Sequence, residues 1–173
     1  NPYVRFAMRV RRGISYEQAV YAYDYRLIYV LANECRITTE TLDERLTPAD
    51  LIILPPATGY RLFYQADAPC TFVLLNFDLD SQRYGEEPIA PVAKEAFNAS
   101  LLFSPLRLPP FEAPVLARKH FALRQSMERL CDLMQRFPPF YEDIMSAELK
   151  AALLQVLIQQ NADRENALIA QVR

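Results

Sequence analysis

A short apolar segment bracketed by prolines constrains the fold of this chain more than any other part of its sequence. The segment reads LTPADLIILPP, and its four apolar residues 51–54 stand between a Pro-Ala-Asp turn and the pair Pro55-Pro56. Pro48 fixes φ in the turn, and Asp50 can accept hydrogen bonds from turn amides. The two later prolines cannot donate to a sheet ladder, so a strand must end before them. The segment therefore predicts a short strand, buried on both faces, that ends at a corner of a β-structure.

The other segments before about residue 110 also have the pattern of strands. They are short, rich in β-branched and aromatic residues, and separated by Pro, Asp and Asn turns, which favours an antiparallel sandwich or barrel. The arginines of MRVRRG, residues 8–13, are expected on a solvated sheet edge, where charge opposes edge pairing. The predicted strands are YVRFAMRV (3–10), YRLIYVLA (25–32), two arms of a hairpin within 35–46, LIIL (51–54), YRLFYQ (60–65) and CTFVLLNFDL (70–79).

The apolar period changes to that of a helix from about Glu112. Apolar residues and one histidine recur at spacings of four and three from Leu116 to Met134, which predicts a continuous helix. The segment FPPF, residues 137–140, is expected to end this helix, because proline removes a helical hydrogen bond.

A second helix is predicted over residues 141–160. It is apolar nearly all round, so we expect it to lie between two surfaces, one of which can belong to a second subunit. Asp163 can cap a last short helix. We therefore predict a β domain over 1–110 and a helical segment over 111–173.

The composition excludes several classes of protein. The net charge is −2 and no dense Lys/Arg run occurs, whereas nucleic-acid binding depends on phosphate neutralisation, so this chain alone is not expected to bind DNA. No apolar run approaches the roughly 20 residues of a membrane span, and no signal peptide is recognised, so we expect a cytoplasmic protein without a membrane partner. Cys35, Cys70 and Cys131 form no CxxC pair, so we predict reduced thiols rather than a zinc site or a disulfide framework.

The ordered series of strands resembles the N-terminal cupin domain of AraC-type transcriptional regulators. YRLIYVLA, a hairpin, ERLTPADLIILPPATGYRL and CTFVLLNFDL carry the resemblance over 21–79, and AELKAALLQVLIQQ (147–160) is similar to the family's second linker helix. Asn33 and Ala49 stand where the pattern has glycine, and alanine adopts left-handed backbone only with strain. The resemblance implies a mainly β fold with α, in which an antiparallel helical dimerisation hairpin follows a cupin-like jelly-roll barrel.

The residues at the cupin metal positions are not a metal-binding set. Cupins that bind metal use a His-x-His pair, a glutamate and a distant histidine, whereas this chain has Tyr21, Tyr23 and Arg26 at the first places and Tyr60 at the last. None of these is a usual ligand of a divalent metal, so no metal and no other cofactor is expected. The only histidine, His120, is expected to be packed in the helical stripe rather than catalytic. We therefore predict that the chain is not an enzyme.

The resemblance implies a sensory function. In such regulators the barrel binds a small effector, the following helices form a homodimer, and a C-terminal pair of helix-turn-helix motifs binds DNA. That pair would follow Arg173, so we expect this chain to be the sensory piece of a longer regulator or, as the less favoured reading, a natural truncation. Tyrosine stacks on sugars or aromatic acids and arginine clamps carboxylates, although a register slip of one residue would reverse their faces. The candidate effector ligands are Tyr21, Tyr23, Arg26, Tyr29, Tyr60 and Arg61, and the candidate dimer contacts are Leu116, Leu123, Met127, Leu130, Leu153, Leu154 and Ile158.

Two other functions fit a cupin-like barrel. A metal-free enzyme such as a sugar epimerase or isomerase needs a general acid and base inside the barrel, normally His, Asp, Glu or Tyr. The predicted strands offer tyrosine but hardly any inward histidine or carboxylate, which disfavours this alternative. A stand-alone small-molecule binding module is the other alternative.

Overall fold

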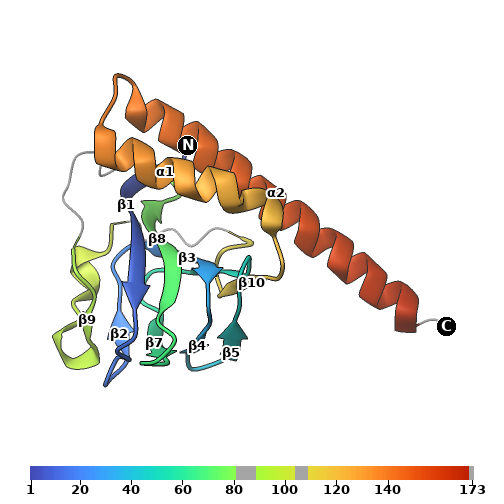
Figure 1. Ribbon diagram of the computed structural model, residues 1–173, viewed down its shortest axis with the longest axis horizontal. Helices are drawn as coiled ribbons and strands as arrows, with labels where there is room; N and C mark the ends of the chain where they lie inside the picture. The colour runs from blue at the N-terminus through green and yellow to red at the C-terminus, as the bar shows by residue number, and fades with distance from the viewer. Residues whose placement is uncertain (81–88, 104–108, 172–173) are drawn as a thin grey trace.

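Two antiparallel sheets and a pair of helices form three layers in the computed structural model, which describes residues 1–80, 89–103 and 109–171 (Figure 1). One sheet has the strand order β1-β8-β3-β6-β10, and the helices lie across it. The other sheet has the order β5-β4-β7-β2-β9 and packs on the opposite face of the first. We call the two sheets together the sandwich.

The bounds of the elements in the first sheet are β1 Tyr3–Arg12, β8 Cys70–Asp78, β3 Tyr25–Ala32, β6 Leu51–Leu54 and β10 Val115–Ala117. Those in the second sheet are β5 Asp43–Leu46, β4 Cys35–Thr38, β7 Gly59–Tyr64, β2 Val20–Tyr21 and β9 Val92–Ala93. The helical elements are η1 Lys94–Ala96, η2 Ala99–Leu101, η3 Phe121–Leu123, α1 Arg124–Arg136 and α2 Tyr141–Gln171.

Every strand segment predicted from the sequence forms a strand, so the mainly β class with α is confirmed. The bracketed segment is β6, all four of its residues are buried, and it lies between β3 and β10. Its preceding turn forms as expected, because Asp50 Oδ2 accepts a hydrogen bond from the Thr47 backbone N–H at 2.8 Å. Ala49 in this turn has a φ of 70°, the left-handed conformation for which the related pattern uses glycine.

Strand β3 separates two apolar cores. Ile28 and Val30 face the second sheet, whereas Leu27 and Tyr29 face the helices, as the alternation of a strand requires. The sandwich interior and the sheet–helix interface are therefore distinct, and the register of β3 decides which candidate residues enter each one. Closure into a jelly-roll barrel stays a prediction, because the strand pairs among the described residues all lie within one sheet or the other.

The helical region differs from the prediction at both ends. Leu116 lies on strand β10, where it pairs with Ile52 of β6, and His120 precedes η3, so the stripe is helical only from residue 121. Lys119 has a φ of 53°, in the left-handed region, and so separates the extended backbone of β10 from the helical backbone that follows. The helix ends before FPPF as predicted, with Phe137 in left-handed conformation.

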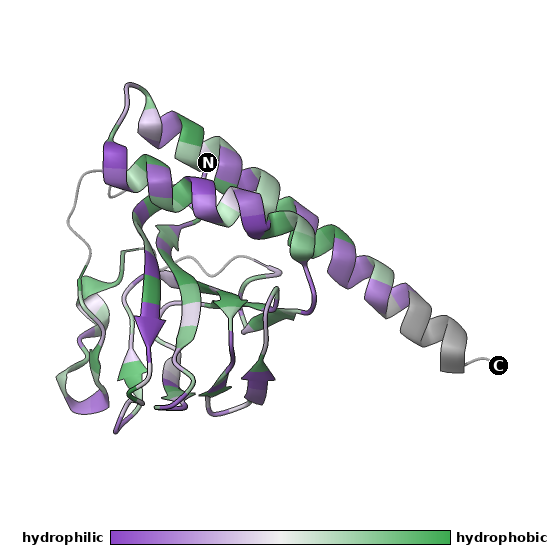
Figure 2. Cartoon of the chain, in the orientation of Figure 1, coloured by the Kyte–Doolittle hydropathy of each residue, from purple (hydrophilic) through white to green (hydrophobic). Residues whose placement is uncertain are grey.

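Helix α2 is one continuous helix of 31 residues, so the separate last helix predicted after Asp163 was wrong. Its first part packs on α1 and β1, and its second part extends beyond the edge of the sandwich (Figure 1). Hydrophobic residues occur along both parts (Figure 2). Neither described helix combines the length and the apolar content required to cross a bilayer.

Candidate functional site

A cluster of buried charged and polar side chains lies where β3 begins and β8 ends. Arg26 is 3% exposed and forms an ion pair with Asp24, with 2.9 Å between Nε and Oδ1. Its Nη1 donates a hydrogen bond to Asn76 Oδ1 at 2.6 Å, because β3 and β8 pair these two residues. Arg5, on the neighbouring strand β1, forms an ion pair with Asp78. Two arginines, two aspartates and an asparagine thus share one apolar environment, which we call the buried polar cluster.

Asp24 is an acid of this cluster whose pKa is strongly shifted. Burial raises its pKa to about 7, with a further increase from Asp78, while Arg26 and Arg5 oppose the shift. The Asp24 carboxylate forms an ion pair with Arg26, and burial outweighs this pair. With this pKa, the Asp24 carboxyl group changes between its protonated and ionised forms near neutral pH. Catalytic acids and bases often have a pKa in this range.

Tyr60 lies next to the cluster on β7. It is 3% exposed, burial raises the pKa of its phenol, and Arg26 and Asp24 both act on it electrostatically. A buried neutral hydroxyl, a guanidinium and a titratable carboxyl group thus come together. They can bind a molecule that has hydroxyl or carboxylate groups.

The segment 89–103 covers this end of the sandwich. The backbone carbonyl of Ile89 accepts a hydrogen bond from Arg26 Nη2 at 3.4 Å. The Asn98 backbone N–H donates to Tyr23 Oη at 3.2 Å, and the Phe97 ring stacks on the Tyr23 ring at 4.8 Å between centroids. Arg5 lies 3.7 Å above the centroid of the Phe103 ring. These contacts close the cluster, and we call the segment the cover.

Four of the six candidate effector-binding residues lie at the end of the sandwich that the cover closes. Tyr23, Arg26 and Tyr60 are buried beside the cluster or under the cover, and the half-buried Tyr21 lies against Phe97 at 5.7 Å. Their role in binding an effector stays a prediction.

The other two candidates lie elsewhere. Tyr29 faces the helices, where its hydroxyl donates a hydrogen bond to the His120 carbonyl at 3.3 Å. Arg61 alternates with the inward Tyr60 and Leu62 and lies 4.8 Å from the Phe63 ring on the outer face. The register of β3 and β7 is the physical reason that neither side chain reaches the buried polar cluster.

The remainder of the sandwich interior is filled by side chains. Ile28, Val30, Ile37, Leu62 and Phe72 are at most 3% exposed and pack in one cluster. Space for a small molecule would therefore come from displacement of the cover rather than from a preformed central cavity.

The sequence reasoning missed Asp24, Asn76, Asp78 and Arg5. A signal for two of them is present, because Asn76 and Asp78 are polar residues two apart in an otherwise apolar strand, and therefore lie on one face. Asp24 stands before a strand and resembles an ordinary turn residue. Only tertiary pairing brings it to Arg5 and Asp78.

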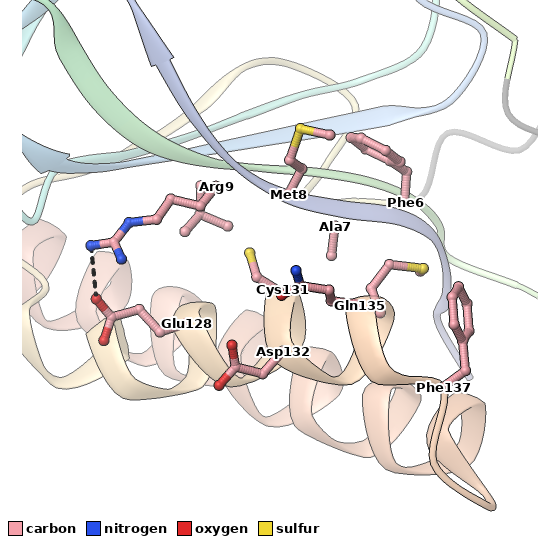
Figure 3. Close-up of a pocket in the computed structure, with 11 residues that line it drawn as sticks. Phe6, Ala7, Met8, Arg9, Glu128, Cys131, Asp132, Gln135 and Phe137 are labelled. Carbon is pink, nitrogen blue, oxygen red and sulfur yellow. Dashed lines mark ion pairs between the residues drawn. The ribbon is translucent and has the colours of Figure 1, made fainter.

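A groove of about 700 Å³ lies outside the sandwich, between β1 and α1 (Figure 3). Phe6, Met8 and Phe137 give it apolar walls, and the ion pair of Arg9 with Glu128, at 3.7 Å, closes one side. No sequence signal indicated it, since its walls come from the two ends of the chain.

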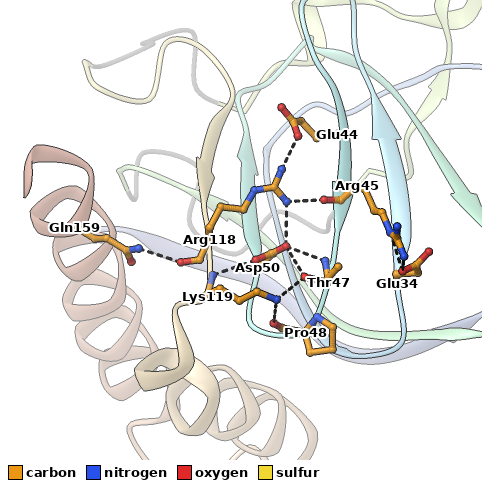
Figure 4. A network of polar contacts seen from close by, with 9 residues as sticks. All are labelled: Glu34, Glu44, Arg45, Thr47, Pro48, Asp50, Arg118, Lys119 and Gln159. Atoms are coloured by element: carbon orange, nitrogen blue, oxygen red, sulfur yellow. Dashed lines mark hydrogen bonds and ion pairs between the residues drawn. The ribbon is translucent and has the colours of Figure 1, made fainter. Parts of the chain in front are cut away.

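A second polar network connects α2 to the sandwich (Figure 4). Asp50 accepts hydrogen bonds from the Lys119 backbone N–H and from Arg118 Nη1, both at 3.0 Å. Gln159 of α2 donates to the Arg118 carbonyl at 3.0 Å. Burial acts to raise the pKa of Asp50, but the hydrogen bonds from Thr47, Lys119 and Arg118 outweigh it and lower the pKa. The network fixes the direction in which α2 leaves the sandwich.

The candidate dimer residues divide into two groups. Leu123, Met127, Leu130 and Leu153 are at most 6% exposed and pack in the core that the helices share with the first sheet, and Leu116 is half-buried on β10. These side chains pack within the chain itself, and their role in a dimer stays a prediction. Leu154 and Ile158 are 51% and 69% exposed on α2.

Within the described ranges, no group of three or more His, Cys, Asp or Glu residues gathers in a way that could hold a metal ion. His120 is half-buried and lies outside the helix in which it was expected. The expectation of a chain without metal or cofactor stays a prediction.

No family model and no curated protein matches the chain. Among solved structures it is similar to the DMSP lyase DddQ from Ruegeria pomeroyi, at 20% identity and a TM-score of 0.39 over 51% of this chain and 41% of that one. It is also similar to a cupin 2 domain-containing protein from Halorhodospira halophila, at 16% identity and a TM-score of 0.39 over 52% of this chain and 57% of that one. An oxalate decarboxylase matches at 13% identity and a TM-score of 0.36, over 40% of this chain and 20% of the enzyme. The matched part thus spans less than two thirds of each of these chains, and no ligand or activity is carried over from them.

The prediction that the chain is not an enzyme is corrected. The structures to which the chain is similar include a lyase and a decarboxylase. Within the molecule, Asp24 supplies the buried carboxyl group whose expected absence had disfavoured an enzyme.

Proposed function

We propose that the chain is the effector-sensing and dimerisation domain of an AraC-type transcriptional regulator. The observation that carries the proposal is the pair of helices across the sandwich, of which α2 continues beyond it with exposed apolar side chains. A DNA-binding part would lie outside this chain, and the sandwich would bind the effector.

The exposed face of α2 has the spacing of a coiled-coil seam. Ala147, Ala151, Leu154 and Ile158 follow one another at intervals of four, three and four residues, and all four are exposed. Apolar residues at this spacing form the contact line between paired helices. We name these four residues the α2 seam, and we expect it to pack against the α2 seam of a second copy.

The effector would bind at the buried polar cluster, beneath the cover. Arg26 would bind a carboxylate or hydroxyl group in place of the Ile89 carbonyl, and Tyr60 and Asn76 would provide further hydrogen bonds. The ligand class is therefore a sugar or a small hydroxylated or aromatic carboxylic acid.

Strand β1 supports the coupling between this site and the helices. Arg5 contacts both Asp78 and the Phe103 ring of the cover. Three residues earlier, the Pro2 carbonyl accepts a hydrogen bond from Ser146 Oγ of α2 at 2.7 Å. A ligand that displaces the cover changes the contacts of Arg5. If the chain has two forms that differ in the position of α2, the ligand shifts the equilibrium toward the form that binds it more tightly.

Ligand-dependent thermal stabilisation tests the effector site. A screen of sugars, aromatic acids and small carboxylates is expected to yield a compound that raises the melting temperature in proportion to the logarithm of its concentration. Arg26→Lys keeps the charge but loses the planar fork, so we expect the dissociation constant of that compound to rise about tenfold or more.

Arg61→Lys is the matched control for this test, because Arg61 lies on the outer face. It is expected to leave the affinity unchanged. The proposed site would be contradicted if both substitutions changed the dissociation constant equally. It would also be contradicted if Arg26→Lys left the dissociation constant unchanged.

A second candidate function is a metal-free epimerase or isomerase. The observation that favours it is the buried Asp24, with a pKa of about 7, beside the buried Tyr60. A carboxyl group with this pKa can remove and return a proton at neutral pH.

Proton exchange with solvent tests this second candidate. An enzyme of this type exchanges a substrate C–H proton for deuterium in D₂O, which proton NMR detects as the loss of one signal from a sugar or hydroxy acid. Asp24→Asn is expected to abolish the exchange, whereas a binding domain that only senses the molecule shows none.

A further inference from the structure

Strand β1 is a long edge of the first sheet. Within residues 1–80, 89–103 and 109–171, β1 pairs with β8 on one side and with no other strand. It has ten residues, whereas the strands at the other three sheet edges, β10, β5 and β9, have three, four and two. The outer edge of such a strand presents backbone N–H and C=O groups that can pair with a further strand. Among the four edges, β1 therefore offers an added strand the most hydrogen bonds.

The groove between β1 and α1 gives the side chains of an added strand a place to pack. It has a volume of about 700 Å³, with β1 on one side and α1 and Phe137 on the other. Figure 3 shows that Ala7 points toward α1 and that Cys131 and Gln135 point back toward the strand. Phe137 is 59% exposed and Met8 is 47% exposed. Apolar side chains placed here would cover apolar surface that now contacts water, which is favourable.

The other end of β1 is basic. Arg9, Arg11 and Arg12 lie within its last four residues, and the strand has no acidic residue. Arg11 and Arg12 are exposed, and they lie opposite Thr71 and Cys70 of β8, which carry no acidic group. Opposite charges on neighbouring strands stabilise a sheet, and like charges oppose pairing. A second copy of β1 has no acidic residue to place beside these arginines, so the edge favours a different, acidic partner.

We propose that β1 binds an extended segment of a partner protein as an additional strand of the first sheet. The segment has apolar residues beside residues 6–8 of β1, next to the groove, and acidic residues beside Arg9, Arg11 and Arg12. Its backbone pairs with the outer edge of β1, and alternate side chains enter the groove below α1. This surface is separate from the buried polar cluster and from the α2 seam, so the proposal does not depend on the proposed function.

Fluorescence anisotropy with labelled peptides and the full chain tests the proposal. The probe joins a run of alternating valine and phenylalanine to a run of glutamate. It is made in both chain directions, because the segment can run parallel or antiparallel to β1. We expect the better of the two probes to bind at least about tenfold more tightly than the same peptide with lysine in place of glutamate. The proposal is overturned if neither glutamate probe binds at millimolar concentration, or if the lysine peptide binds equally well.

Methylation of backbone nitrogens in the better probe distinguishes strand pairing from contact through side chains alone. Successive N–H groups of a strand point to opposite edges, so only one alternate set faces β1. Methyl groups on that set should weaken binding at least about tenfold, whereas methyl groups on the other set should change it less than about twofold. If the two sets have equal effects, or if neither has any, the segment does not bind as a strand and the proposal is wrong.

Arg11→Glu and Arg12→Glu test the charge preference from the side of the protein. Both side chains are exposed, so we expect both variants to fold. Each substitution should weaken binding of the glutamate probe by about threefold or more and should strengthen binding of the lysine peptide. Lys150→Glu is the matched control, because Lys150 is an exposed cation on α2 that does not line the groove. It should leave both affinities unchanged, and an equal effect of all three substitutions would count against the β1 edge.

Discussion

Replacing Leu154 and Ile158 with glutamate is expected to leave a folded monomer, where we expect the unmodified chain to be a dimer. Both side chains are exposed, so the change removes little packing within the chain. Four glutamates would meet across a two-fold seam, and like charges in such a position cost several kcal/mol, so the dimer dissociation constant should rise at least about 100-fold. Sedimentation equilibrium at micromolar concentrations measures this change.

Phe121→Glu is the control for this double substitution. Phe121 is also an exposed apolar residue, at 66%, but it lies on η3, outside the α2 seam. It should leave the dissociation constant unchanged. An unmodified chain that sediments as a monomer would refute the proposed dimerisation, and a Phe121→Glu variant that dissociates instead would move the interface away from α2.

The strands were predictable because their signals are local. The bracketed segment 51–54 has an apolar run and a proline stop in consecutive residues, and β3 and β8 are long enough to show β-branched and aromatic enrichment. Strands β2 and β9, of two residues each, are too short to show any periodicity. They exist because neighbouring strands pair with them.

The helical stripe from Leu116 was misleading for a related reason. Apolar residues three and four apart need not belong to one helix. Here Leu116 lies on β10 and packs against the core between the two sheets, whereas Leu123, Met127 and Leu130 pack in the core under the helices. The supposed break at Asp163 has neither proline nor glycine beside it, so the helix continues.

The candidate site was predictable only in part. Tyr23, Arg26 and Tyr60 were found from the family pattern. The inward register of β3 and β7 buries Arg26 and Tyr60, whereas Tyr23 precedes β3 and is buried against Phe97 of the cover. Asp24 could not be found, because its raised pKa comes from burial in the folded chain, which the sequence of a turn does not indicate. Cys35 and Cys70 are likewise far apart in sequence, and only the packing of the two sheets places both in one buried apolar cluster.

The stability of the protein is expected to fall as the pH rises from about 4 to 7, and Asp24→Asn should remove most of this dependence. Asp24 has a pKa of about 7 in the folded chain against 3.8 for the ordinary group. Between these values the folded state holds a proton that the unfolded state has lost, so the free energy of unfolding decreases with pH. The slope reaches at most about 1.4 kcal/mol per pH unit, and the loss over the whole window is on the order of 4 kcal/mol. Urea unfolding at pH 5, 6, 7 and 8 measures it.

Asp163→Asn, on the exposed part of α2, is the control and should keep the slope of the unmodified chain. A free energy of unfolding that stays level or rises between pH 5 and 7 would show that Arg26 keeps Asp24 ionised in the folded protein. The outcome also bears on ligand binding, because a molecule that presents a cation or a hydroxyl group to Asp24 favours its ionised form. Such a molecule would release a proton on binding near pH 7, and it would therefore bind more tightly as the pH rises. An anion placed beside Asp24 would have the opposite dependence, so the sign of the pH effect identifies the charge of the group that lies there.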